Sequence, residues 1–114
     1  MSDELAKIVS YLETYAANIR RELAAATRDA DGRASLFTNV GLAEHAGIDL
    51  EAAAAELAAA AAGVARGVHL GYRRRGENVS PRVLVARYMR DRGRFAAIEA
   101  ARSIEAGAHM ETMT

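Results

Sequence analysis

Arginine is the residue of this sequence with the clearest capacity for binding chemistry. Eight arginines fall between positions 73 and 94, against only two acids, Glu77 and Asp91. They are Arg73, Arg74, Arg75, Arg82, Arg87, Arg90, Arg92 and Arg94. A guanidinium group is a planar fork of hydrogen-bond donors that matches the oxygens of a phosphate. The cluster therefore favours an anionic partner, although an ordinary solvated helix face can carry a similar run of charge.

The charge of the chain is divided between its two parts. Over all 114 residues the net charge is zero. Residues 1–66 hold six Lys or Arg against ten Asp or Glu, whereas residues 67–114 hold nine against five. Such a division indicates an anionic partner for the second part, or head-to-tail association between copies of the chain.

The residues that commonly carry catalysis or bind metals form no such pattern here. The sequence has no cysteine, and its histidines, His45, His69 and His109, lie far apart, so no two of them fall one helical turn from each other. It contains no glycine-rich phosphate loop and no nucleophile elbow. We therefore predict a protein that is not an enzyme and that needs no metal and no cofactor.

Composition predicts a mainly α-helical fold with a single domain. Alanine, the best helix former, is abundant, and there is one proline. A chain of 114 residues is long enough to bury a core without disulfides. No apolar run approaches the roughly 20 residues of a membrane span, and the chain begins with acids where a signal peptide needs positive charge. We expect a cytoplasmic protein with no membrane partner.

The first element that must position the arginines is a long amphipathic helix over residues 2–27. Ser2 can cap this helix, and apolar residues recur along it at steps of three and four. The stripe consists of Leu5, Ile8, Leu12, Tyr15, Ile19 and Leu23. Its narrow, heptad-like shape suits docking on the domain core and equally suits a coiled-coil seam with a second copy. In the second case, Leu5, Ile8, Leu12, Tyr15 and Ile19 would form the interface of a homodimer.

Residues 38–48, TNVGLAEHAGI, predict a helix that ends in a sharp turn. Thr38 can cap this helix, and Gly47 permits a left-handed turn conformation. Ala43 is small where two helices must cross, and Ile48 would fill the gap between them. The stretch resembles the helix-turn-helix of bacterial and phage DNA-binding regulators, in which a threonine precedes Leu-Ala and an Ala-Gly-Ile makes the turn. The resemblance implies a helix-turn-helix over residues 38–62.

The second helix of this motif, predicted over residues 49–62 and ended by Gly63, departs from that family. A recognition helix usually carries polar and basic side chains in its first two turns, because base edges and phosphates need hydrogen-bonding partners. Here those turns hold Asp49, Glu51 and Glu56 among alanines, with no basic residue. We therefore expect a helix that packs as a scaffold, and whose acidic, alanine-rich face offers a surface for a protein partner.

Two segments beside the motif are expected to be extended. Leu36 and Phe37 form an apolar pair that is expected to make a very short strand or to plug the core. Residues 68–79 begin with alternating apolar and polar residues and end in turn residues. This pattern suits the β-hairpin wing that follows the recognition helix in winged-helix proteins. An irregular solvated loop is an equally open interpretation of the same residues.

The last part of the chain is expected to add two helices. Ser80 and Pro81 mark the start of a helix over residues 80–92, with proline at its first position. A second helix is predicted over residues 94–106, and residues 108–114 are predicted to be a disordered tail. The fold class is then mainly α, with five helices around a helix-turn-helix core in a single domain over residues 1–107.

These expectations combine into a small winged helix-turn-helix DNA-binding protein, a transcriptional regulator of bacterial or phage type. It would be a homodimer that binds double-stranded DNA mainly through its arginines, with two further contacts to phosphate at a helix N-terminus. The expected nucleic-acid contacts are Thr38, Asn39, Arg73, Arg74, Arg75, Arg82, Arg87 and Arg90. The alternative is a helical protein-interaction adaptor with a helix-turn-helix-like core that binds no DNA. Zero net charge and the acidic second helix favour this alternative.

Overall fold

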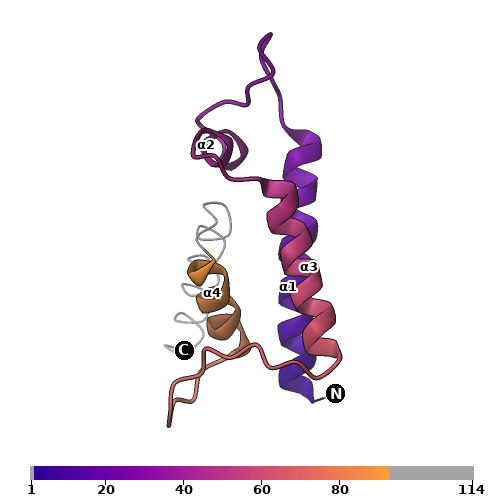
Figure 1. Ribbon diagram of the computed structural model, residues 1–114, viewed down its shortest axis with the longest axis vertical. Coiled ribbons are helices and arrows are strands. Elements are labelled where there is room, and N and C mark those ends of the chain that lie inside the picture. The colour runs from indigo at the N-terminus through magenta and orange to yellow at the C-terminus, as the bar shows by residue number, and fades with distance from the viewer. Residues whose placement is uncertain (1, 93–114) are drawn as a thin grey trace, which may run out of the picture.

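The computed structural model describes residues 2–92, which contain four α-helices and no strand (Figure 1). The helices are α1 (Asp3–Ala25), α2 (Asn39–His45), α3 (Leu50–Ala65) and α4 (Pro81–Asp91). The prediction of a mainly α-helical fold is confirmed. The predicted β-hairpin wing is wrong, and the described residues hold four helices where five were expected for the chain. The helix predicted over 94–106 and the tail predicted over 108–114 lie outside the described residues.

An antiparallel pair, α1 and α3, forms the centre of the fold, and α4 packs against α1 (Figure 1). The two helices of the pair bury mostly aliphatic side chains and alanines. These are Ile8, Leu12, Ala16 and Ile19 of α1, and Leu50, Ala53, Ala54, Leu57, Ala61, Gly63 and Val64 of α3. Small residues bring two helix axes close together. The alanine-rich sequence of α3 therefore serves its packing against α1.

The apolar stripe of α1 is used inside the chain. Ile8, Leu12 and Ile19 are buried in the core, while Leu5 and Tyr15 are partly buried and pack against it. Of the two interpretations of this stripe, docking on the domain core is the one that the fold adopts. A homodimer through the same stripe stays a prediction, and it would require these side chains to leave the core.

Helix α4 begins as the sequence predicts and buries one face. Ser80 occupies the cap position with Pro81 in the first turn, although the serine side chain makes no capping hydrogen bond. The residues that face the core are Leu84, Val85, Ala86, Tyr88 and Met89. Two arginines of the same helix, Arg87 and Arg90, lie off this face, where they can reach the segment that precedes α4.

Helix α2, a tight turn and α3 follow one another where the sequence predicts two helices and a turn. Thr38 caps α2 by accepting a hydrogen bond from the Gly41 amide, and Asp49 caps α3 by accepting one from the Ala52 amide. Gly47 has a φ of +77°, in the left-handed region that favours glycine. The Ile48 amide donates to the Ala43 carbonyl over 2.9 Å, which closes the end of α2 in a Schellman motif. The cap and turn residues were all predicted in these places.

Gly41 permits a close approach that the sequence analysis did not anticipate. It is buried in α2, and a Cβ atom at this position would lie 1.9 Å from the Ser35 carbonyl oxygen. The Ser35 carbonyl is a backbone group, and the Cβ atom would be fixed to the backbone of α2. Neither can move aside without shifting the loop or the helix. The segment before α2 therefore lies directly against the helix, and only glycine fits at position 41.

Helix α3 runs further than predicted. Gly63 was expected to end it, but the helix continues to Ala65, and Gly67 with a φ of +97° makes the turn. The Val68 amide donates to the Gly63 carbonyl over 2.9 Å, which closes a second Schellman motif. Gly63 instead lies buried inside α3. The chain folds back over this position, so that a Cβ atom there would lie 3.7 Å from the Val68 side chain.

Residues 66–80 form an irregular segment between α3 and α4. Gly71 and Tyr72 have φ values of +85° and +73°, which interrupt the extended backbone that a strand needs. Leu70, Tyr72 and Val79 nevertheless turn their side chains toward the core. The alternation of apolar residues thus predicted part of the buried face correctly, but the backbone pairs with no strand.

Leu36 and Phe37 do not plug the core and do not form a strand. The side chain of Phe37 is fully exposed, and Leu36 is 53% exposed. Leu42 of α2 is a further exposed apolar residue in this part of the fold. The expectation for this pair is therefore wrong, because Val40, Ala43 and Ala34 fill the core beneath α2 instead.

Candidate nucleic-acid interface

Tyr72 fixes the start of the arginine run to α4. Its φ of +73° is unusual for a residue with a side chain and costs about 1–2 kcal/mol. Its carbonyl accepts a hydrogen bond from Arg87 over 3.0 Å, and its hydroxyl donates to Asp91 over 2.6 Å. The ring also packs edge-on against Tyr88, with 6.0 Å between ring centres. The hydrogen bond to Asp91 raises the pKa of the Tyr72 hydroxyl, so the group stays protonated as a donor.

Glu77 joins the segment to α4 through a two-pronged ion pair. Its two carboxylate oxygens accept hydrogen bonds from the Arg87 guanidinium over 2.7 and 2.5 Å. The same carboxylate accepts a bond from the backbone amide of Arg74 over 3.1 Å. The hydrogen bonds from Arg87 are the main reason that the pKa of Glu77 falls to about 2. Glu77 is therefore ionised at neutral pH and holds the turn of the segment against α4.

Arg73 ties the same segment to α1. Its guanidinium pairs with the Glu4 carboxylate in the first turn of α1. It also lies 3.4 Å from the carbonyl oxygens of Glu77 and Val79. These contacts hold Arg73 at the N-terminal end of α1, and its predicted role in binding nucleic acid stays a prediction.

Arg82 is likewise engaged within the fold. Its Nε donates to the Tyr11 hydroxyl over 3.0 Å, and its guanidinium lies 5.4 Å from the centre of that ring. A guanidinium on an aromatic face gains from the charge distribution of the ring. Arg82 therefore bridges α4 and α1, and its predicted role as a phosphate contact gains no support from this geometry.

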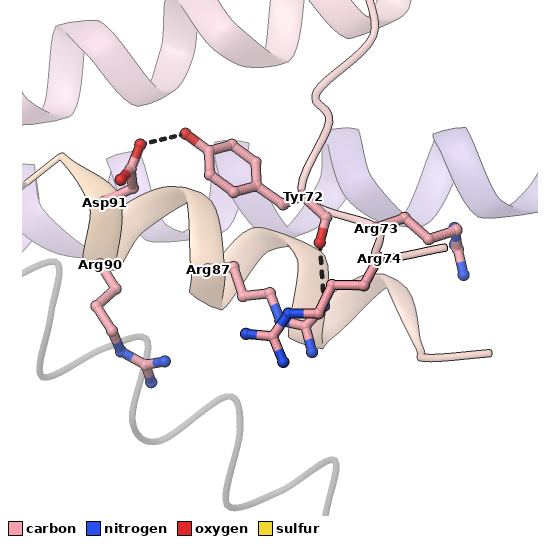
Figure 2. A pocket seen from close by; sticks show the side chains of 6 residues that line it. All are labelled: Tyr72, Arg73, Arg74, Arg87, Arg90 and Asp91. Atoms are coloured by element: carbon pink, nitrogen blue, oxygen red, sulfur yellow. Dashed lines mark hydrogen bonds between the residues drawn. The ribbon is translucent and has the colours of Figure 1, made fainter. Parts of the chain in front are cut away.

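An open hollow of about 510 Å³ lies between the start of the arginine run and α4 (Figure 2). Its lining residues are Tyr72, Arg73, Arg74, Arg87, Arg90 and Asp91. Figure 2 shows the side chains of Arg74 and Arg87 extending toward the same region, while Arg73 points away toward another side. Arg75 follows at the exposed turn before Gly76. The fold brings Arg74, Arg87 and Arg90 to one hollow, and with the exposed neighbour Arg75 these residues are named the arginine cluster below.

The other two predicted nucleic-acid contacts lie at the opposite end of the molecule. Thr38 and Asn39 start α2, beside the C-terminal end of α1, whereas the arginine cluster lies toward its N-terminal end (Figure 1). A helix of 23 residues such as α1 is roughly 35 Å long. The Thr38 hydroxyl also donates to the Ser35 carbonyl over 2.6 Å while it caps α2. The fold therefore does not gather all the predicted contacts on one compact site.

Helix α3 presents acids and alanines to solvent, as the sequence indicates. Asp49 is used in the cap, Glu51 is exposed in the first turn, and Glu56 pairs with Arg92 over 3.3 Å. One face of α3 is buried against α1, and the exposed positions on its other side are mostly alanines. Its exposed surface thus offers few donors to a phosphate or to a base edge.

Sequence reasoning overlooked the residues that hold the arginine cluster in place. Glu77 and Tyr72 make the contacts to α4, and Glu4 makes the contact to α1. One available signal was the position of Glu77, a single acid close behind three consecutive arginines. A carboxylate so close to several arginines is well placed to form an ion pair with an arginine of the same chain. No comparable signal marks Glu4, which lies 69 residues before its partner.

Comparison with protein-family models, curated proteins and solved structures finds no match to this chain. Within residues 2–92, none of the helices is both long and apolar enough to cross a membrane. The same part of the chain holds no group of three His, Asp or Glu side chains placed to bind a metal ion. The functional interpretation therefore depends on the geometry and charge of the described residues.

Proposed function

We propose that this protein binds double-stranded DNA through the arginine cluster, with the helix-turn-helix acting as a scaffold. The observation that supports this most is that Arg74, Arg87 and Arg90 all line one open hollow, with Arg75 exposed next to Arg74 in the chain. Arginine side chains that neutralise phosphates supply the sequence-independent part of DNA affinity. The contacts would be to the DNA backbone rather than to base edges.

The proposal differs from the usual use of a helix-turn-helix. A recognition helix reads bases in the major groove with its first turns. In α3 those turns hold Asp49 and Glu51, whose carboxylates would repel phosphates. A role as a transcriptional regulator would accordingly depend on backbone contacts, on DNA shape or on a further protein, rather than on base contacts from α3.

Binding to a random DNA duplex across a salt series tests the proposal. We compare the wild type with Arg74→Ala/Arg75→Ala, which removes two arginines with exposed side chains from the cluster. Each lost phosphate contact should make the slope of log affinity against log salt shallower by about 0.9. The double variant should therefore lose up to about two units of slope, measured by fluorescence anisotropy.

A matched control removes the same charge elsewhere. Arg20→Ala/Arg33→Ala deletes two exposed arginines, one in α1 and one in the loop before α2. Its slope should stay close to that of the wild type. Absence of DNA binding by the wild type at low salt, or equal loss of slope in both double variants, would contradict the proposal.

A second candidate function is a protein-interaction adaptor. Phe37 is fully exposed, with Leu36 and Leu42 as further exposed apolar side chains near α2. Exposed aromatic residues beside other apolar residues are common in protein interfaces. If the partner is a second copy, sedimentation should give a mass above the 12.2 kDa of one chain, and Phe37→Ser should reduce it to that value. Equal masses for the two proteins would contradict this version of the adaptor.

A further inference from the structure

We infer that the hollow beside Tyr72 seats a single phosphate group, bound by the exposed side chains of Arg74 and Arg90, with Arg87 as a fixed wall of the hollow. The inference rests on the proposed function in one respect, namely that the phosphate belongs to DNA. It names phosphate as the ligand class and gives Arg74, Arg87 and Arg90 different roles, although all three carry the same charge. The three arginines line the hollow together with Tyr72.

Arg74 is the principal donor of this site. Its backbone amide is bonded to Glu77, but its guanidinium makes no hydrogen bond to any other described residue. The side chain is exposed and extends toward the guanidinium of Arg87 (Figure 2). A phosphate oxygen is a suitable acceptor for the fork of Arg74.

Arg87 forms a fixed wall of the hollow rather than a flexible arm. Glu77 accepts hydrogen bonds from both of its terminal nitrogens, and the Tyr72 carbonyl accepts another. These bonds fix the guanidinium, and the ionised Glu77 carboxylate balances its charge. Arg87 is thus a positioning residue, because it holds the segment that carries Arg74 against α4.

Arg90 extends the site along α4. It follows Arg87 by three residues on the same helix, so the two side chains lie on neighbouring parts of one face. Its side chain is exposed and also lines the hollow. On the other side, the Asp91 carboxylate accepts the Tyr72 hydroxyl, away from the side chains of Arg74 and Arg87 (Figure 2). The Asp91 carboxylate is therefore engaged by Tyr72 and does not face Arg74.

Titration with inorganic phosphate and pyrophosphate, followed by calorimetry at low ionic strength, tests the site directly. We compare the wild type with Arg74→Gln and with the matched control Arg20→Gln, which removes an exposed arginine of α1 outside the hollow. Loss of a charge-assisted donor should weaken pyrophosphate binding by about tenfold in Arg74→Gln. Arg20→Gln should change it by less than about threefold, the effect of a more distant exposed charge. Equal losses in the two variants, or no binding by the folded wild type, would overturn the inference.

Competition with DNA separates this inference from the proposed function. Duplexes with and without 5′-phosphates distinguish a chain-end phosphate from a backbone phosphate, and pyrophosphate should displace either at low salt. If pyrophosphate binds through Arg74 but no duplex binds, the phosphate site stands and the proposed function fails. If a duplex binds in an arginine-dependent way but pyrophosphate neither binds nor competes, the proposed function stands and the phosphate site fails.

Discussion

The helix-turn-helix over residues 38–65 and the arginine segment over residues 66–92 reach their shapes by different kinds of interaction. The first is built by local devices: the caps Thr38 and Asp49, the left-handed Gly47, and a hydrogen bond between Ile48 and Ala43. The second is held by side chains far apart in the sequence, as in the pairs of Arg73 with Glu4 and of Arg87 with Glu77. Capping and turn interactions between neighbouring residues can be recognised in a sequence. Ion pairs between residues far apart in the sequence form only when the fold brings them together.

The difference also explains how the functional assignment changed. The helix-turn-helix resemblance placed the expected DNA contacts partly on α2, at Thr38 and Asn39. The fold places the arginine cluster toward the other end of α1 and gives Arg73 and Arg82 structural partners. The two helices that resemble a DNA-binding motif thus carry few groups that suit DNA, whereas the arginines that suit DNA lie on residues 66–92.

The largest expected effect comes from the core that both regions share. Leu12 is fully buried in α1, where the helices meet. Leu12→Ala should lower the free energy of unfolding by about 2–5 kcal/mol, because it removes packing and leaves a cavity. Urea denaturation measures this loss. Leu36→Ala makes the same truncation at a side chain that is 53% exposed, and should change stability by less than about 0.5 kcal/mol.

The same pair of variants bears on the predicted homodimer. If the stripe of α1 serves only the core, Leu12→Ala changes stability but leaves the sedimentation mass of the folded protein unchanged. A wild-type dimer that dissociates in Leu12→Ala while the chain stays folded would contradict the assignment of this stripe to the core.

A somewhat smaller effect tests the helix-turn-helix region alone. Gly41→Ala should lower the free energy of unfolding by about 1–3 kcal/mol, because its Cβ atom would overlap the Ser35 backbone. Gly47→Ala has open space but a φ of +77°, so it should cost only about 1 kcal/mol through backbone strain. Thermal or urea denaturation of both variants measures the difference. A Gly41→Ala protein as stable as the wild type would show that the loop before α2 does not lie against the helix.

The smallest effect concerns the ion pair that closes the arginine segment. The pKa of Glu77 is about 2 in the folded chain, below its ordinary value of 4.5. Because folding lowers this pKa, ionised Glu77 stabilises the fold above about pH 4.5, and this contribution is lost progressively as the pH falls toward 2. Glu77→Gln should flatten this part of the stability curve in urea denaturation at several pH values.

Glu13→Gln is a suitable control for that measurement. It removes an exposed carboxylate of α1 that makes no ion pair within residues 2–92. The control should keep the acid dependence of the wild type. If Glu77→Gln keeps it as well, the contact between residues 66–80 and α4 contributes nothing in solution.

The sequence allowed the helices to be predicted well, because their signals are local. Ser2, Thr38, Asp49 and Pro81 start the four helices as expected. The apolar stripe of α1 also identified its buried face correctly. These features depend on capping groups and on a period of three to four residues, both of which can be read from neighbouring residues.

Other features could not be predicted, because they depend on contacts between distant segments. Gly63 was expected to end α3, but it lies inside the helix and Gly67 makes the turn. The alternating residues of 68–79 suggested a hairpin, yet Tyr72 adopts a left-handed conformation that its contacts with α4 stabilise. Which arginines are engaged within the chain became evident only from the positions of Glu4, Glu77 and Tyr11.

The salt dependence of duplex DNA binding tests the central contrast most directly, with one variant in each region. Arg74→Ala/Arg75→Ala alters the arginine segment, and Asn39→Ala alters the exposed start of α2. The account predicts a slope shallower by up to about two units for the arginine variant, and an unchanged slope for Asn39→Ala. The opposite result, in which Asn39→Ala loses DNA binding and the arginine variant behaves like the wild type, would contradict this account. It would indicate that DNA contacts the helix-turn-helix.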